Sequence, residues 1–280
     1  MSMLLNRAKI EPRLADEYTI MTWNVLADCC CTDDEQGFPC VSWASRDPTK
    51  RHSLHELELK SARPDIIVLQ EVDHACFENI IVNMGKYFVF SSKHENSQHG
   101  LLTAVNLDVF EVVENGQIKV PDSTRIFHWV KLKSHDGQDV ILVNLHLHAK
   151  NQIEKRRKEL EYVLRDLRDV SGGILIAGDF NDTPESEIYK NMELSGYRNG
   201  TSSPSVSFTT CKTRILENQD YKVKRQIDYI WGFGQIDFLQ VLSSNYEIEV
   251  PDVGFPSEHY PSDHLSQICS FQLLKSNYQA

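Results

Sequence analysis

The chain has 280 residues, of which 41% are hydrophobic and 25% are charged, and its net charge is −11. This composition is ordinary for a soluble globular protein and allows one large α/β domain or two small ones. The acidic balance argues against a protein that grips long nucleic acid through a basic face, because such affinity comes from neutralising phosphates. It does not argue against a phosphate-handling enzyme whose carboxylates hold cations.

Signals for targeting and for disulfide formation are sparse. The seven cysteines include no Cys-x-x-Cys pair, and a redox or acylation role for the contiguous three at 29–31 competes with the commoner interpretation of idle thiols. Residues 1–17 carry neither a signal peptide nor a transit peptide, and no stretch approaches the ~18 apolar residues of a membrane helix. We expect a cytoplasmic or nuclear protein without membrane association, with an N-terminal extension at 1–17 and one folded domain at 18–280.

The first strand is expected at 18–26, which is rich in β-formers. A second strand is expected at 65–72, an aliphatic run that follows a helix at 51–62. Asn24 is a polar residue inside the first strand and requires a partner if it is buried. Glu71 closes the second strand, where a carboxylate is costly unless it is paired or bound to a metal. A hydrogen-bonded core amide and a solvated strand end are the plain alternatives.

The middle of the chain predicts a helix, a strand, a polar loop and two hairpin strands, at residues 73–86, 87–90, 91–99, 101–113 and 126–133. The Asn-Gly pair within 114–116 is a turn signal between the two hairpin strands. The polar loop contains His94 and His99, which we expect at the surface.

A further strand is predicted at 139–148, and its second half alternates so that Asn144, His146 and His148 share one face. Three polar side chains on one face near a strand end indicate a functional site, whereas a lone histidine would more often be structural. The amphipathic helix expected at 153–170 carries a basic run. That run is solvated by default, although an arginine at its site-facing end could contact phosphate.

Residues 174–184 form the most informative stretch of the chain. Mostly aliphatic residues form a buried strand, which breaks at Gly178 and presents Asp179 and Asn181 at its end. Pro184 suits the first turn of a following helix. A carboxylate and an amide two residues apart suit metal or phosphate chemistry, and they equally suit a turn.

The C-terminal part predicts a loop, a strand, a second loop and a final strand, at residues 201–220, 225–231, 250–260 and 267–273. The strand at 225–231 embeds one carboxylate, Asp228. The dipeptide Asp263-His264 comes just before the final strand.

Polar residues thus fall within or at the ends of hydrophobic strands along the whole chain. Carboxylates, amides and histidines gathered at one rim of a sheet suit hydrolysis assisted by a hard cation, because Mg²⁺ takes oxygen ligands and activates water. A serine hydrolase is disfavoured since no Gly-x-Ser-x-Gly elbow exists. Zinc is disfavoured because His and Cys ligands are not clustered in the sequence.

Six short motifs occur in order: Thr22-Trp23-Asn24, Leu69-Gln70-Glu71, Asn144-Leu145-His146-Leu147, Gly178-Asp179-Phe180-Asn181, Ile227-Asp228-Tyr229 and Ser262-Asp263-His264. At these residues the chain resembles the endonuclease/exonuclease/phosphatase superfamily, over residues 18–273. The segments 23–27 and 260–266 are similar to its nocturnin and poly(A)-deadenylase branch. The resemblance implies a catalytic domain with a four-layered α/β sandwich, in which two packed β-sheets are flanked by helices.

The resemblance also implies roles for individual residues. Glu71 would bind Mg²⁺, or Mn²⁺ in its place, with Asn24 and Asp263 helping to place the ion. Asp179 would orient or deprotonate the attacking water, and Asn181 would hold the phosphate.

Histidines would complete the predicted site. His146 and His264 would donate to phosphate oxygens, and Asp228 would fix the tautomer of His264. Substrate contacts are expected from Asn144, His148, Lys150 and Arg157. The branch usually has His-Leu-Lys-Ala-Arg where this chain has residues 146–150. Histidine in place of that lysine predicts pH-sensitive substrate binding.

The leading hypothesis is a Mg²⁺-dependent phosphodiesterase that shortens RNA from its 3′ end. A rival is a phosphatase for a small nucleotide, such as a dinucleotide bearing a 2′-phosphate, which the acidic balance favours. An endonuclease is a third alternative, and a non-enzymatic scaffold is disfavoured because all the expected acidic and histidine positions are occupied. Recruitment to RNA would need another protein, and the oligomeric state stays open.

Overall fold

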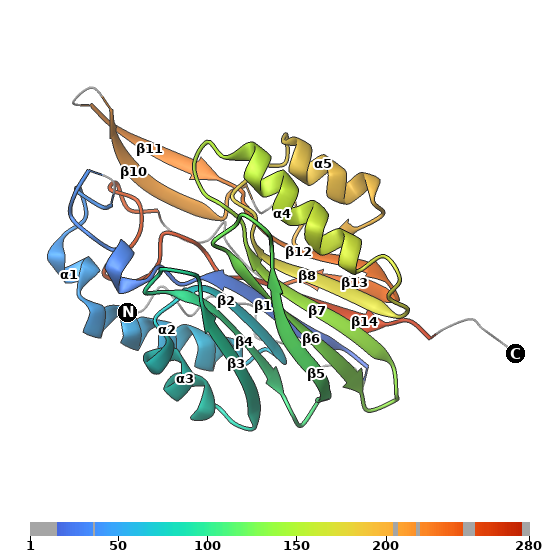
Figure 1. The fold of residues 1–280 in the computed structure, drawn as a ribbon. Helices are drawn as coiled ribbons and strands as arrows, with labels where there is room; N and C mark the ends of the chain where they lie inside the picture. Colours follow the sequence, from blue (N-terminus) through green and yellow to red (C-terminus); the bar gives the residue numbers. More distant parts are fainter. Residues whose placement is uncertain (1–15, 36, 204–206, 217–218, 243–249, 276–280) are drawn as a thin grey trace, which may run out of the picture.

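The computed structural model describes residues 16–35, 37–203, 207–216, 219–242 and 250–275. Two six-stranded β-sheets pack face to face, and helices cover their outer faces (Figure 1). The predicted four-layered α/β sandwich is therefore confirmed.

The first sheet has the strand order β13-β14-β1-β2-β4-β3. In that order its strands are Ile236–Val241, Gln267–Leu273, Tyr18–Asn24, Ile66–Val72, Gly100–Asn106 and Tyr87–Lys93. β1 runs parallel to β2 and antiparallel to β14. The aliphatic run of β2 is buried on both faces, as expected for a strand that lies between a second sheet and a layer of helices.

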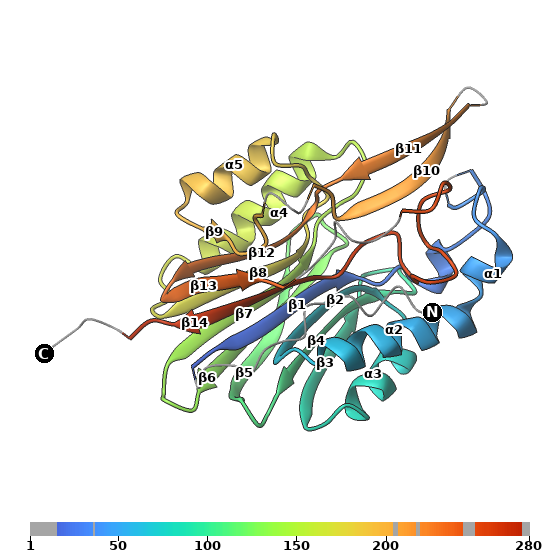
Figure 2. The same ribbon diagram turned by 180° about the vertical axis from the view of Figure 1, so that it is seen from behind.

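The second sheet has the strand order β5-β6-β7-β8-β12-β9. In that order its strands are Phe110–Lys119, Ile126–Ser134, Asp139–His146, Gly173–Asp179, Asp228–Gly234 and Arg198–Asn199. β7 runs parallel to β8, and β12 pairs antiparallel with β8 on its other side. A separate two-stranded hairpin, β10 (Thr210–Leu216) and β11 (Gln219–Arg225), projects from the body of the molecule (Figure 2).

Helices cover each sheet on the side away from the other sheet. α1 (Trp43–Arg46), α2 (Pro48–Ala62) and α3 (His74–Val82) lie with the first sheet, and α4 (Ile153–Asp166) and α5 (Glu187–Leu194) lie with the second (Figures 1 and 2). A 3-10 turn, η2 (Asp28–Cys30), follows β1. Three large apolar clusters result, one under each helical layer and one between the sheets, and a small fourth cluster lies in the segment after β1.

Two crossover connections give the fold its functional rim. β1 passes through α2 to its parallel neighbour β2, and β7 passes through α4 to its parallel neighbour β8. The carboxyl ends of these four strands meet at one edge of the sandwich, since Asn24 at the end of β1 contacts Asp179 at the end of β8 at 3.1 Å. Ligands of open α/β sheets bind at such edges.

The turn predicted within 114–116 is wrong, because these residues lie inside β5. β4 ends at Asn106 in one sheet and β5 begins at Phe110 in the other, so the chain crosses between sheets instead of turning back. Gly116 serves close packing: a Cβ there would lie 2.7 Å from Nε1 of Trp129 on the neighbouring strand.

The loop predicted at 201–220 is wrong in its second half, where β10 and the start of β11 lie. Positions 204–206 and 217–218 of that stretch are outside the described residues. The expected N-terminal extension also lies outside them, except for residues 16 and 17. None of the described helices is long and apolar enough to cross a membrane, and all seven cysteines are free.

Candidate active site

The first sheet contributes an amide and a carboxylate to the rim. Asn24 ends β1 and Glu71 lies one residue before the end of β2. Glu71 is the extra residue of a bulge between β2 and β4 and has φ 55°. A bulge turns a side chain away from the regular alternation of the strand, and Glu71 Oε1 accepts a hydrogen bond from Asn24 Nδ2 at 3.1 Å.

The second sheet contributes an imidazole and a second carboxylate. His146 ends β7, and Asp179 pairs with it at the end of β8. Asp179 Oδ2 accepts from Asn24 Nδ2 at 3.1 Å, and its Oδ1 accepts from the backbone N–H of Asn181 at 2.8 Å. His146 Nε2 lies 3.6 Å from Asp179 Oδ2 and 4.0 Å from Glu71 Oε1. The two sheets thus join their polar groups through Asn24 and His146.

A buried Asp–His dyad completes the centre. His264 Nδ1 lies 2.9 and 3.0 Å from the two carboxylate oxygens of Asp228, which begins β12 opposite Asp179. Thr209 Oγ1 donates to Asp228 Oδ2 at 2.5 Å, and Trp23 Nε1 donates to the carbonyl of His264 at 2.8 Å. Asp228 therefore holds the ring through Nδ1 and Trp23 holds the backbone of His264, while Nε2 of the ring lies 3.9 Å from Asp179 Oδ2.

Burial and neighbouring charges move the pKa values of this centre in different directions. Burial, together with the negative charge of Asp228, raises the pKa of Asp179 to about 7. Burial alone would lower the pKa of His264, but the charges of Asp228 and Asp263 outweigh it and raise that pKa to about 10. Burial and the charge of Arg125 hold the pKa of His146 well below its ordinary value. The centre therefore pairs a neutral imidazole with a charged one.

The rim fits a divalent cation. Across the described residues, no lysine or arginine lies within 4.0 Å of the Glu71 or Asp179 carboxylates, and their neighbours at that distance are the neutral His146 and the charged His264. Asp179, Asp228 and His264 also offer ligand atoms within 4.8 Å of one another. Since His264 Nδ1 is already bonded to Asp228, the oxygen donors of Glu71 and Asp179 are the better place for a hard cation.

Two predicted participants lie beside the centre with other partners. Asp263 is buried, and its Oδ2 lies 3.1 Å from Lys212 Nζ of β10. Burial raises the pKa of Asp263, but Lys212 and the charge of His264 together outweigh burial and lower that pKa. Asn181 has φ 52° and donates through Nδ2 to the carbonyl of Leu147 at 3.0 Å. Asn181 thus ties the loop after β8 to the loop after β7.

Two of the residues expected to contact substrate have other partners in the structure. Asn144 is fully buried; its Nδ2 donates to the carbonyl of Leu102 at 2.9 Å and its Oδ1 accepts from Gln70 Nε2 at 3.0 Å. Asn144 is a satisfied core amide that joins the two sheets. Arg157 lies on the outer face of α4, where Nη2 contacts Glu154 Oε2 at 2.6 Å.

The arginine that matters on α4 is the neighbouring Arg156. It is buried and donates to the carbonyls of His148 and Lys150, at 3.0 and 2.8 Å, so it shapes the loop after β7. His148 Nδ1 contacts the buried Glu159 carboxylate of the same helix. The signal was present in the sequence, because Arg156 lies one helical turn before the buried Leu160 and shares its face.

Sequence reasoning also missed Thr209, Arg125 and His94. Thr209 lies in the stretch predicted to be a loop, and the hydrogen bonds that it makes to Asp228 are set by tertiary structure. Arg125 Nη1 lies 3.5 Å from His146 Nδ1. His94 was expected at the surface but is only 4% exposed.

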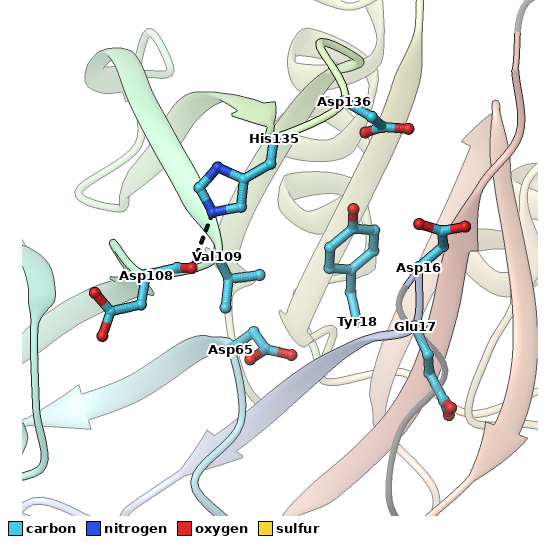
Figure 3. Close-up of a pocket in the computed structure, with 8 residues that line it drawn as sticks. All are labelled: Asp16, Glu17, Tyr18, Asp65, Asp108, Val109, His135 and Asp136. Carbon is cyan, nitrogen blue, oxygen red and sulfur yellow. Dashed lines mark hydrogen bonds between the residues drawn. The ribbon is translucent and has the colours of Figure 1, made fainter.

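A separate cavity of about 340 Å³ lies at the opposite end of the sheets, where β1 and β2 begin (Figure 3). Its lining residues are Asp16, Glu17, Tyr18, Asp65, Asp108, Val109, His135 and Asp136. It is rich in carboxylates but receives no residue of the centre described above.

This fold and this site define a class of protein. The sequence model of the endonuclease/exonuclease/phosphatase family matches residues 21–264. The chain belongs to that family and is a hydrolase of phosphoric esters.

Among curated proteins, the chain is similar to nocturnin. It is 26% identical to nocturnin of Xenopus laevis over 91% of this chain and 72% of the relative, and 25% identical to human nocturnin over 92% and 66%. It is 22% identical to the CCR4-Not complex 3′-5′-exoribonuclease subunit Ccr4 of Candida albicans over 95% of this chain and 42% of the relative. The chain thus spans about two thirds of nocturnin and less than half of Ccr4, and the predicted resemblance is confirmed.

Solved structures agree on the fold. ANGEL2, a 2′,3′-cyclic phosphatase, in complex with adenosine-2′,3′-vanadate matches with a TM-score of 0.80 at 17% identity, over 92% of this chain and 96% of that one. The human nocturnin catalytic domain with bound sulfate matches with a TM-score of 0.66 at 22% identity, over 94% and 96%.

Proposed function

We propose that the protein is a Mg²⁺-dependent exoribonuclease that shortens RNA from its 3′ end. The observation that carries the proposal is the meeting of Glu71, Asp179 and the Asp228–His264 dyad at one rim. This set can hold a hard cation, accept a proton from water and donate to phosphate oxygens. The 3′-5′ direction is supported by the likeness to Ccr4.

Glu71 would hold the Mg²⁺, and Asn24 would keep the Glu71 and Asp179 carboxylates in place through its Nδ2. When bound, the ion offsets negative charge on the phosphate and favours attack by water. Mg²⁺ suits these ligands because it prefers carboxylate oxygens and keeps several waters. Asp263 would contribute only at a distance, since Lys212 already neutralises it.

Asp179 would take the proton of the attacking water. The water oxygen bonds to phosphorus while the P–O3′ bond breaks, the departing 3′ oxygen is protonated by water, and a nucleoside 5′-monophosphate is released. His264, charged over the neutral pH range, would donate from Nε2 to a phosphate oxygen, with Asp228 holding its tautomer. His146 accepts from Arg125 at Nδ1 and so carries its proton on Nε2, where it would donate to the same phosphate.

The basic hairpin β10–β11 supports a polymeric substrate. It carries five cationic residues, Lys212, Arg214, Lys222, Lys224 and Arg225. The hairpin contacts the segment that carries His264, since Thr210 forms a β-bridge with His264. A chain with a net charge of −11 thus places a local positive surface beside its site, which is where RNA phosphates would lie. A recruiting protein and a cytoplasmic location remain predictions.

A phosphatase for a small nucleotide is the second candidate. The acidic balance of the whole chain limits the surface along which a long polymer could bind. The ANGEL2 structure, described as a 2′,3′-cyclic phosphatase, has the same fold. Such an enzyme would use the same cation, base and dyad on a terminal phosphate.

Product analysis separates the two candidates. The purified protein is incubated with Mg²⁺ and either a 5′-labelled RNA that ends in poly(A) or a 2′-phosphorylated dinucleotide, with Asp179→Asn as the blank. A ladder that shortens from the 3′ end, with release of 5′-AMP, is expected from the wild type alone. Phosphate released from the dinucleotide while the RNA stays intact would transfer the assignment to the phosphatase, and internal fragments would indicate an endonuclease.

A further inference from the structure

His94 is a buried histidine with one nitrogen left without a partner. Its Nδ1 accepts a hydrogen bond from the backbone N–H of Ile126 at 3.2 Å. A nitrogen that accepts carries no proton, so the proton of the neutral ring must be on Nε2. Nε2 is buried, and no acceptor lies near it among the described residues. Leaving such a donor unpaired costs free energy, and such groups call for an explanation.

His94 borders the active site and lies near the positive charge of Arg125. Its ring lies 5.9 Å from the ring of His146 and 6.0 Å from that of His99. Burial and the charge of Arg125 lower the pKa of His94 to about 2, so the ring stays neutral and Nε2 stays a donor.

Arg125 supplies a positive charge at the same place. Burial lowers its pKa, against the more distant charges of Glu71, Glu159 and Asp179, which raise it. Over the described part of the chain no carboxylate lies within 4.0 Å of its guanidinium. Its contact with His146 Nδ1, at 3.5 Å, leaves most of its donors unused. The fork of donors on a guanidinium matches the oxygens of a phosphate group.

This cluster does not suit a cation. In the described residues, only Asp179, Asp228 and His264 bring three ligand atoms within 4.8 Å of one another. The charge of Arg125 would also repel a metal ion. Both unused groups, the Arg125 guanidinium and His94 Nε2–H, are donors, so the complementary ligand is an anion.

We propose that Arg125 and His94 form a subsite for a second phosphate of the substrate, next to the phosphate that is cleaved. His146 separates the two positions, because its Nε2 faces Asp179 while its Nδ1 faces Arg125. The subsite rests on the proposed function, since it selects substrates with two phosphates over substrates with one. Neither Arg125 nor His94 belongs to the six motifs of the sequence.

The first test measures binding without turnover. Inorganic phosphate is titrated in metal-free buffer that contains EDTA, and the rise in Tm is followed for the wild type, His94→Phe and Arg125→Met. A ligand that binds only the folded state raises Tm in proportion to its affinity. Free phosphate also has the position beside His146 and His264, so we expect both variants to lose the part of the rise that the subsite contributes and to keep the rest. His94→Gln restores a donor near the position of Nε2 and should recover some of the lost part.

The second test compares substrates. Diadenylate with and without a 5′-phosphate is hydrolysed by the same variants. Loss of a hydrogen bond to a charged group predicts that His94→Phe raises KM for the phosphorylated substrate about tenfold or more, with a smaller effect on the unphosphorylated one and on kcat.

The matched control is His128→Phe. His128 is also buried, but both of its nitrogens have partners, Ser92 Oγ at 2.6 Å and Thr103 Oγ1 at 3.1 Å. It should lose stability and keep the phosphate response. An unchanged phosphate response in folded His94→Phe, His94→Gln and Arg125→Met would overturn the subsite. A normal phosphate response in a protein that hydrolyses neither RNA nor nucleotide would instead overturn the proposed function.

Discussion

At the scale of the residue, Asp179 is a carboxylate that suits proton transfer but lowers the stability of the folded protein. It is buried at the end of β8, faces Asp228 across the antiparallel pairing and has no lysine or arginine partner among the described residues. Burial and Asp228 therefore raise its pKa to about 7. A base with a pKa near the working pH suits proton transfer, but its ionised form is unfavourable in the folded state.

The Asp179→Asn variant should be more stable than the wild type in metal-free buffer. The folded pKa lies above the unfolded value, so the cost of ionised Asp179 is absent below about pH 4, grows as pH rises and is complete above about pH 7. At pH 8 we expect a Tm a few degrees higher, with activity abolished. Thermal melts from pH 4 to 8 measure the difference.

The contrasting variant is Asp228→Asn. Removing this carboxylate takes away the partner of His264 and of Thr209, so its Tm should fall. A lower Tm for Asp179→Asn at pH 8 would show that the ionised carboxylate stabilises the fold. That result would contradict its assignment as a base with a raised pKa.

Single residues at strand ends were also the most predictable part of the site. Polar residues in buried strands need partners, and six of them meet at the rim: Asn24, Glu71, His146, Asp179, Asp228 and His264. Asn144 fits the same pattern but finds its partners inside the core. A polar residue in a hydrophobic strand predicts that it has a partner, but only the tertiary structure shows which partner it is.

At the scale of the element, the end of β8 depends on a close approach of two strands. Gly178 has φ 151°, and a Cβ there would lie 1.9 Å from the carbonyl oxygen of Leu145 on β7. This approach brings Asp179 level with His146.

Gly178→Ala should therefore unfold the protein or lower its Tm by well over ten degrees. The matched control is Gly137→Ala: Gly137 also has a positive φ, 86°, but nothing lies within 4 Å of its missing Cβ. That change should cost only about 1 kcal/mol, the strain of the backbone alone. Equal losses of Tm for the two variants would contradict the close-approach argument.

The hairpin β10–β11 supplies a second prediction at this scale. Replacing Lys222 and Lys224 by Gln should weaken RNA binding. It should also make the fall of log affinity with log salt less steep, by about 0.7 for each RNA phosphate that the hairpin no longer neutralises. Hydrolysis of a small nucleotide should change little. Filter binding from 50 to 300 mM salt measures the slope, with Lys86→Gln, on the β3 side of the molecule, as the control. An unchanged slope would remove the hairpin from the RNA path.

Two elements could not be predicted from local sequence. The Asn-Gly pair in β5 has the composition of a turn, but Gly116 is there to make room for Trp129. The hairpin β10–β11 lies in a Ser- and Thr-rich stretch without periodicity, and it is ordered by contacts with the segment around His264. In both cases residues distant in the sequence decide the local structure.

At the scale of the whole molecule, two similar halves create one site. Each sheet contains a parallel pair joined by a helix, and each pair ends in polar residues, Asn24 and Glu71 in one, His146 and Asp179 in the other. The sequence predicted the four layers through the resemblance of its six motifs. The packing of the two sheets then brings the two sets of side chains within hydrogen-bonding distance.

The central claim is that this shared rim is a Mg²⁺-dependent hydrolytic centre. The most direct measurement is the initial rate of 5′-AMP release from poly(A)-ended RNA as Mg²⁺ is titrated, for the wild type and Glu71→Gln. We predict a saturable dependence, no release in EDTA, and a midpoint for Glu71→Gln at least about tenfold higher, since one charged ligand is removed. AMP release in EDTA, or the same midpoint for both proteins, would contradict the account.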